Sequence, residues 1–184
     1  PYDNFVWDVV ENSSFYPDSI QVPMLLVGGW YDHNTWYYPE LFERLRTESA
    51  LAVRSQHRML MGPWVHGGTG FAAIGTSQQG ELSYPDAAGA QRVYERQFAD
   101  YHLRGLNNGW DTVAPVRYYR TGQQRWTDTT HLPNSSTVMR LNLVKRNGVG
   151  ELTSATASEQ NEQSFNSDPE QPSPTLGGKT LSLA

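Results

Sequence analysis

The clearest pattern in the chain is a run of aliphatic residues, VPMLLV at residues 22–27, that ends at Gly28-Gly29. A run without polar alternation is typical of a strand buried on both faces, as in a parallel sheet. Apolar residues then recur at helical spacing between residues 35 and 49, and a second apolar run, RMLMG, follows at residues 58–62. Strand, helix and strand in this order predict a right-handed βαβ unit.

The later part of the chain has a different pattern. Residues 67–85 are rich in Gly, Ser and Gln and predict a long loop before a helix at residues 86–103. Short β-rich runs then follow, among them APVRYYRTG and STVMRLNLV, separated by turn residues. We therefore expect two domains: an α/β domain with a parallel sheet at residues 1–109, and an antiparallel β domain at residues 110–184.

Composition narrows the classes of function. The 14 basic and 19 acidic residues give a net charge of −5, and no cluster of Lys or Arg stands out. The sequence therefore shows no positively charged patch of the kind that binds nucleic acids or anionic membranes. No apolar run is long enough to span a membrane. The absence of cysteine excludes disulfides, thiolate nucleophiles and cysteine metal sites. The five histidines show no HxxxH-type spacing, so we expect neither a metal nor a cofactor.

Both ends of the chain look cut. It starts at Pro1 rather than Met, and the last residues, TLSLA, read like the start of a strand. We expect the chain to be part of a longer protein, and its sequence leaves both the oligomeric state and the compartment open.

Two residues at strand ends carry the candidate chemistry. Asp32 follows the first predicted strand and His66 follows the second, and ligands of open α/β sheets bind beyond the carboxyl ends of the strands. A carboxylate beside an imidazole makes up two thirds of a nucleophilic triad, and Asp before His is the chain order of α/β-hydrolases. Spacing alone leaves other interpretations open: Asp32 as a helix cap, and His66 as a hydrogen-bonded loop histidine.

The residues that make up the two motifs favour the interpretation as a catalytic triad. GGWYD after the first strand and GPWVH after the second closely resemble paired motifs of the cocaine-esterase and Xaa-Pro dipeptidyl-peptidase family of serine hydrolases. Other segments resemble the family in the same order along the chain: PYDNFVW, QFADYHLRG, PVRYYRTGQQRW and SDPEQPSPTLGG. The resemblance implies that residues 1–109 are the C-terminal part of an α/β-hydrolase domain. Residues 110–184 would begin an antiparallel β-sandwich of the jelly-roll kind.

The resemblance also implies roles for single residues. Asp32 would be the acid of the triad and His66 its general base. The serine of the family lies in an upstream Gly-x-Ser-x-x-Gly elbow that nothing in residues 1–31 matches, so the remainder of the hydrolase domain is the expected partner. The isolated chain is expected to be inactive. Trp30 and Asn34 flank the acid as candidate substrate contacts, with packing at the strand end as the alternative for Trp30.

The expected function is hydrolysis of acyl-ester or Xaa-Pro peptide bonds in a small-molecule or peptide substrate, through an acyl-enzyme. One alternative is an amino-ester hydrolase or β-lactam acylase of the same family. Another is a non-catalytic module in which the β-rich region binds carbohydrate or protein through aromatics, namely Tyr118, Tyr119 and Trp126.

Overall fold

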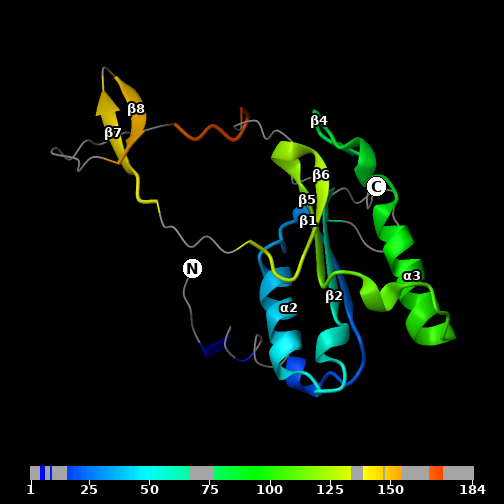
Figure 1. Ribbon diagram of the computed structural model, residues 1–184. Coiled ribbons are helices and arrows are strands. Elements are labelled where there is room, and N and C mark those ends of the chain that lie inside the picture. The colour runs from blue at the N-terminus through cyan, green and yellow to red at the C-terminus, as the bar shows by residue number, and fades with distance from the viewer. Residues whose placement is uncertain are drawn as a thin grey trace. The chain divides into compact units, whose positions relative to one another are not determined.

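The structure is a computed structural model that describes residues 5–6, 9, 16–66, 77–133, 139–146, 148–154 and 166–171. The chain forms two compact units: residues 1–132 with 175–184, and residues 133–174. The first unit contains a mixed four-stranded sheet with the strand order β1-β2-β5-β6 (Figure 1). The second unit contains an antiparallel hairpin.

The strands of the described residues are β1 (Leu25–Tyr31), β2 (Arg58–Val65), β3 (Gln78–Gln79), β4 (Leu82–Ser83), β5 (Val116–Arg120), β6 (Arg125–Thr129), β7 (Asn142–Arg146) and β8 (Val149–Thr153). The α-helices are α2 (Tyr37–Glu48) and α3 (Ala90–Arg104). Short 3-10 helices occur at η1 (Pro17–Ser19), η2 (Arg54–Gln56), η3 (Pro85–Ala87), η4 (Trp110–Thr112) and η5 (Thr121–Gln123).

The predicted strand–helix–strand unit is confirmed. β1 and β2 pair in parallel, with Leu26 opposite Met59 and Gly29 opposite Gly62. Helix α2 connects them and lies against one face of the sheet (Figure 1). The register shifts between Gly29 and Tyr31, so β1 is irregular at its end, just before Asp32.

Each face of the sheet has its own hydrophobic core. On the face covered by α2, the buried core consists of Leu26, Phe42, Leu45, Met59, Met61 and Val116. On the face covered by α3, it consists of Leu60, Trp64, Tyr84, Ala87, Tyr94, Trp110 and Tyr119. Successive residues of a strand point to opposite faces, so Met59, Leu60 and Met61 alternate between the two cores. This alternation explains why the run in β2 is apolar without interruption.

The strand β5 lies elsewhere than expected. The segment APVRYYRTG was expected in the antiparallel domain, but β5 pairs in parallel with β2 and in antiparallel with β6. Val116 and Tyr119 of this strand are 0% and 1% exposed, one in each core. Burial on both faces thus joins β5 to the sheet of the first unit. The expected division at residues 109/110 falls inside that unit, and the two units divide after Leu132.

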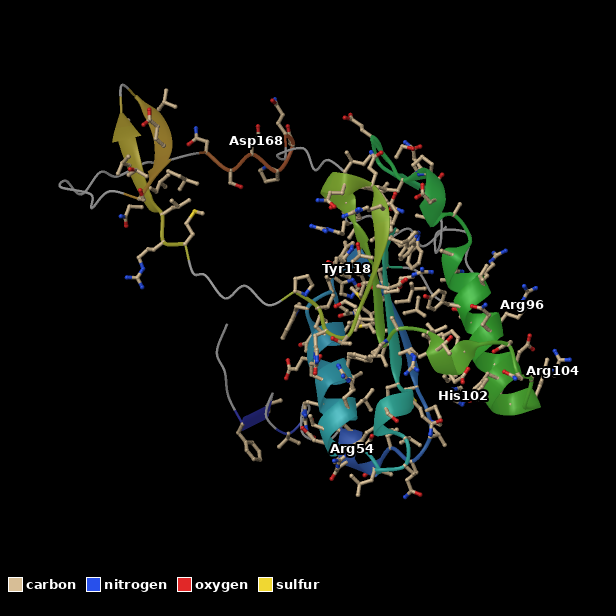
Figure 2. The ribbon with its side chains drawn as sticks, viewed as in Figure 1. Arg54, Arg96, His102, Arg104, Tyr118 and Asp168 are labelled. Carbon is tan, nitrogen blue, oxygen red and sulfur yellow. The ribbon has the colours of Figure 1, made fainter. Side chains whose placement is uncertain are left out.

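The second predicted helix is confirmed as α3, which ends at Gly105 with a positive φ of 65°. It begins later than expected because Pro85–Ala87 forms a 3-10 turn first. Arg104 lies in its last turn (Figure 2). Its guanidinium group donates to Asp100 at 2.7 Å. No helix in the described ranges is both long and apolar enough to cross a bilayer.

Several sequence expectations fall on residues that the structure does not describe. Most of PYDNFVW, the first ten residues of the expected loop at 67–85, and the last part of SDPEQPSPTLGG lie outside the described residues. The segment STVMRLNLV is described from Met139, and its end contributes to β7, which pairs with β8.

Candidate active site

Asp32 is fixed in a tight turn directly after β1. Its backbone N–H donates to the carbonyl oxygen of Gly29 at 3.1 Å, and its Oδ1 accepts the backbone N–H of Asn34 at 2.8 Å. The Asp32 side chain is 5% exposed. Helix α2 begins only at Tyr37, with Trp36 as its N-cap. The alternative of Asp32 as a helix cap is therefore wrong: the carboxylate stabilises the turn that precedes the helix.

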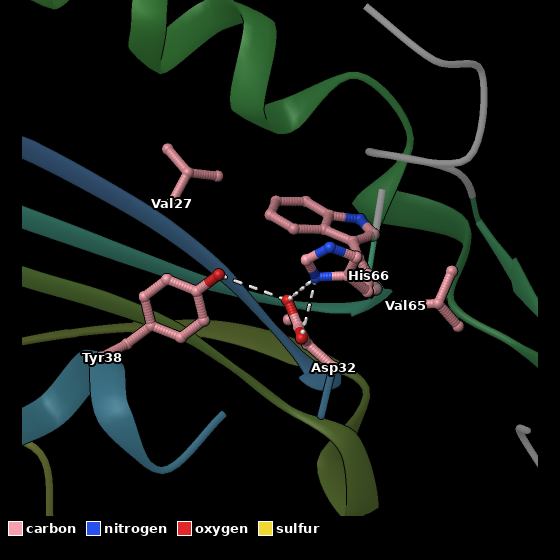
Figure 3. Close-up of a pocket in the computed structure, with 8 residues that line it drawn as sticks. Val27, Asp32, Tyr38, Val65 and His66 are labelled. Carbon is pink, nitrogen blue, oxygen red and sulfur yellow. Dashed lines mark hydrogen bonds and ion pairs between the residues drawn. The ribbon is translucent and has the colours of Figure 1, made fainter. Parts of the chain in front are cut away.

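His66 lies beside Asp32 because the strands that precede the two residues are parallel neighbours. Tyr31 at the end of β1 is the register partner of Val65 at the end of β2, so the next residues emerge together at one edge of the sheet. His66 Nδ1 lies 3.1 Å from both Oδ1 and Oδ2 of Asp32 (Figure 3).

The contact defines the tautomer of His66 that suits a base. An ionised carboxylate only accepts hydrogen bonds, so Nδ1 of His66 is the atom that donates to Asp32. In a neutral imidazole, Nε2 then keeps its lone pair and can take a proton. The His66 side chain is 43% exposed. The pair thus has the geometry of an oriented general base.

Tyr38 is a third member of the cluster that sequence analysis missed. It lies in the first turn of α2 and donates its hydroxyl to Oδ2 of Asp32 at 3.2 Å (Figure 3). Burial, together with the negative charge of Asp32, raises the pKa of Tyr38 to about 12. The sequence shows three consecutive aromatics here, Trp36, Tyr37 and Tyr38. The first two are exposed and stacked on each other, and helical periodicity alone did not identify the third as the partner of Asp32.

We expect Tyr38→Phe to change how stability depends on alkaline pH. Folding raises the pKa of Tyr38 from 10.0 to about 12, so the unfolded chain loses this proton first. The stabilisation is complete below pH 10 and is lost as pH rises toward 12. Melting temperatures of the complete protein should therefore fall more steeply in this range for wild type than for Tyr38→Phe. The other tyrosines are common to both proteins, and parallel curves would contradict the prediction.

Comparison with known proteins bears on these residues directly. The model of the family described as X-Pro dipeptidyl-peptidase (S15 family) matches residues 1–68, which include Asp32, Tyr38 and His66. The chain is also 26% identical over 173 residues to cocaine esterase from Rhodococcus sp. (strain MB1 Bresler), a match that covers 88% of this chain. Residues 1–68 are thus similar to the X-Pro dipeptidyl-peptidase (S15) family, and most of the chain is similar to an esterase. Peptidases and esterases are both hydrolytic enzymes, so both similarities are to hydrolases.

The chain spans only part of the length of this relative. The match covers 28% of the length of the cocaine esterase.

The space beside the Asp32–His66 pair is small and mostly apolar. A cavity of about 50 Å³ lies next to the two side chains, lined by Val27, Gly28, Gly29, Asp32, Tyr38, Trp64, Val65 and His66 (Figure 3). A volume of this size holds a water molecule or two rather than a substrate. Among the described residues, the pair therefore lies at an edge of the sheet beside a cavity that is too small for a substrate.

Trp30 and Asn34, the two candidate substrate contacts, do not line this cavity. Trp30 donates its indole N–H to the carbonyl oxygen of Tyr119 at 2.7 Å and packs edge-on against Tyr118. Asn34 contributes its backbone N–H to the Asp32 turn. The structure thus gives both residues contacts within the fold, and their contact with a substrate stays a prediction.

His33 is the fourth polar side chain of the cluster. Its Nδ1 lies 3.5 Å from Oδ1 of Asp32, and its ring centroid lies 4.5 Å from that of His66. Asp32, His33 and His66 each offer one ligand atom, and these three atoms lie within 4.8 Å of one another. Such a grouping could hold a metal ion. The expectation of no metal rested on spacing along the chain. It missed this grouping because the two histidines come from different strand ends.

A Ser–His contact elsewhere in the chain, between Ser49 and His57, is structural. His57 accepts the backbone N–H of Met24 on Nδ1 at 3.1 Å, so its Nε2 carries the proton and donates to Oγ of Ser49 at 2.9 Å. Ser49 donates its own hydroxyl to the carbonyl oxygen of Leu45. Burial, reinforced by the charge of Arg58, lowers the pKa of His57. A nucleophilic serine must give its proton to the histidine, and here the donation runs the other way.

The aromatics considered for a carbohydrate- or protein-binding surface are engaged within the first unit. Trp126 donates its indole N–H to the carbonyl oxygen of Asp86 at 3.1 Å and packs against Trp64 and Tyr119. Tyr119 is buried in the core on the α3 face. Tyr118 contacts the ring of Trp30 (Figure 2 shows Tyr118 on β5). These contacts account for all three aromatics by packing.

Proposed function

We propose that the complete protein is a serine hydrolase that cleaves ester or amide bonds through an acyl-enzyme. The observation that carries the proposal is the contact between Asp32 and His66, with Nδ1 3.1 Å from both carboxylate oxygens. The similarity of residues 1–68 to a peptidase family, and of most of the chain to an esterase, supports the same reaction class.

In the proposed mechanism, His66 is the general base. Its Nε2 takes the proton of the serine hydroxyl as the serine attacks the carbonyl carbon, and then gives that proton to the leaving alkoxide or amine. Water, activated by the same nitrogen, hydrolyses the acyl-enzyme. Asp32 holds the ring through Nδ1 and stabilises the imidazolium that forms. The serine and the oxyanion donors would come from the part of the hydrolase domain that this chain does not cover.

The surroundings of Asp32 support its assignment as the acid. The Asn34 N–H and the Tyr38 hydroxyl donate to its two different oxygens. These two hydrogen bonds fix the plane of the carboxylate while leaving lone pairs on both oxygens for His66. A carboxylate held in this way orients the imidazole before substrate arrives, which is how a preorganised site lowers the barrier.

The proposed domain arrangement follows from the same family. Residues 1–109 would form the C-terminal part of an α/β-hydrolase domain, with β1 and β2 as neighbouring strands of its parallel sheet. The division of the two units after Leu132 supports an antiparallel β-sandwich domain that begins later than residue 110. The hairpin of β7 and β8 would be part of that domain.

The assay that tests the function compares four substrate classes on the complete protein. We expect hydrolysis of p-nitrophenyl acyl esters or Xaa-Pro p-nitroanilides without added cofactor. Faster cleavage of α-amino esters or β-lactams than of either would favour the amino-ester hydrolase alternative. A complete, folded protein that cleaves none of these substrates and does not react with a fluorophosphonate would contradict the proposal.

A further inference from the structure

We propose that Asp32, His33 and His66 form a zinc-binding site, and that bound zinc switches the hydrolase off. The three residues come from two loops at one edge of the sheet, and their ligand atoms lie within 4.8 Å of one another. The inhibition rests on the proposed function, whereas the binding of the metal does not.

The distances already resemble those of a coordination sphere. Oδ1 of Asp32 lies 3.1 Å from Nδ1 of His66 and 3.5 Å from Nδ1 of His33. Ligand atoms around a tetrahedral zinc with bonds of about 2.0–2.1 Å are about 3.3–3.4 Å apart. Both measured distances fall close to that value, so zinc binding needs shifts of only a few tenths of an ångström at these two contacts.

The donor set selects the kind of metal. Two imidazole nitrogens and one carboxylate oxygen suit zinc and neighbouring transition metals, whereas magnesium and calcium prefer oxygen ligands. Three protein ligands leave a fourth position for water, as in other zinc sites that are open to solvent.

The residues around Asp32, His33 and His66 also suit a metal site. The Asn34 N–H and the Tyr38 hydroxyl hold the carboxylate, and such outer hydrogen bonds orient metal ligands in proteins. The Asp32 side chain is 5% exposed, whereas those of His33 and His66 are 49% and 43% exposed. The negative charge therefore lies at the buried end of the cluster, and the two imidazoles form its entrance from solvent.

Zinc and catalysis require the same atom. In the proposed mechanism, Nδ1 of His66 carries the proton that is donated to Asp32. A zinc ion bound to Oδ1 and Nδ1 would use the lone pair of Nδ1, and the ring proton would then lie on Nε2, which would have no lone pair left to accept the proton of the serine. His66 can then no longer become the imidazolium that proton transfer requires. Bound zinc thus blocks proton transfer by His66, and His33 supplies the third ligand beside Asp32 and His66.

The test compares the complete wild-type protein with His33→Ala and His131→Ala. His131 is a matched control, since it also lies beside a carboxylate, Glu43, at 3.3 Å, and no three-residue metal grouping of the described chain includes it. Zinc affinity is measured by titration calorimetry in a non-chelating buffer, and cobalt(II) provides a second readout through its visible absorption bands. Inhibition by zinc is measured relative to the metal-free activity of each protein.

We expect His33→Ala to bind zinc at least about tenfold more weakly than wild type and to need a correspondingly higher zinc concentration for inhibition. His131→Ala should match wild type. Equal zinc affinity in wild type and His33→Ala would overturn the metal site, as would a cobalt spectrum that does not depend on His33. If the metal-free protein has no hydrolase activity while cobalt binding still depends on His33, the proposed function fails and the metal site stands.

Discussion

His66→Ala in the complete protein is expected to lower kcat by about 10⁴-fold or more, with a much smaller change in KM. The variant removes the only group that can take the proton of the serine in the proposed mechanism. The side chain of His66 contacts Asp32 and is 43% exposed, so its removal should leave the fold intact. Ester or anilide hydrolysis under saturating substrate provides the measurement.

Asp32→Asn should lower kcat by about 10³- to 10⁴-fold in the same assay. The amide keeps the size of the carboxylate but loses its charge, and its NH₂ group favours the wrong tautomer of His66. His131→Ala is the control, since His131 is an exposed histidine that contacts Glu43 and Arg46, away from the Asp32 turn. Activity of His66→Ala or Asp32→Asn within about tenfold of wild type would contradict the assignment of that residue.

Gly29→Ala is expected to be among the most destabilising single substitutions in the chain, by about 3 kcal/mol or more. A Cβ at Gly29 would collide with the backbone carbonyl of Trp64, with its carbonyl carbon only 2.7 Å away. Both partners belong to the paired strands β1 and β2, so relief requires the strands to separate at the end that presents Asp32 and His66. The melting temperature of the complete protein provides the measurement.

Gly122→Ala is the matched control for Gly29→Ala. A Cβ at Gly122 meets no atom within 4 Å, and the backbone there does not have a positive φ. We expect its melting temperature to stay within about 2 °C of wild type. A Gly29→Ala protein as stable as Gly122→Ala would show that β1 and β2 do not approach as closely as the structure has them.

The part of the fold that the sequence predicted is the part set by local periodicity. Leu60 and its neighbours in β2 are buried on both faces, and an unbroken apolar run is the pattern that such burial requires. The positions of Asp32 and His66 followed because residues directly after parallel strands emerge at the same edge. From the sequence alone, a structural role and a catalytic role of Asp32 were alternatives. The hydrogen bond from the Asn34 N–H gives Asp32 a structural role in the turn, and this role is compatible with a catalytic one.

What sequence analysis missed depends on contacts between side chains that spacing along the chain does not predict. Tyr38 and His33 join the cluster through their orientations, which no spacing rule predicts. The strand β5 was missed for a related reason. A short run such as VRYYR reads the same in a parallel or an antiparallel pair, and burial of Val116 against β2 decided its place. The sequence left two roles open for Trp30, contact with a substrate and packing at the strand end. Its hydrogen bond to the carbonyl oxygen of Tyr119 is a contact within the fold.

The rate of covalent capture by a fluorophosphonate tests the central claim most directly, because it reports activation of the serine without any need to know the substrate. In the complete wild-type protein we expect one serine to be modified. In His66→Ala the rate should fall at least about 100-fold, and in His131→Ala it should be unchanged. Capture of the same serine at equal rates in wild type and His66→Ala would show that the Asp32–His66 pair does not activate the nucleophile.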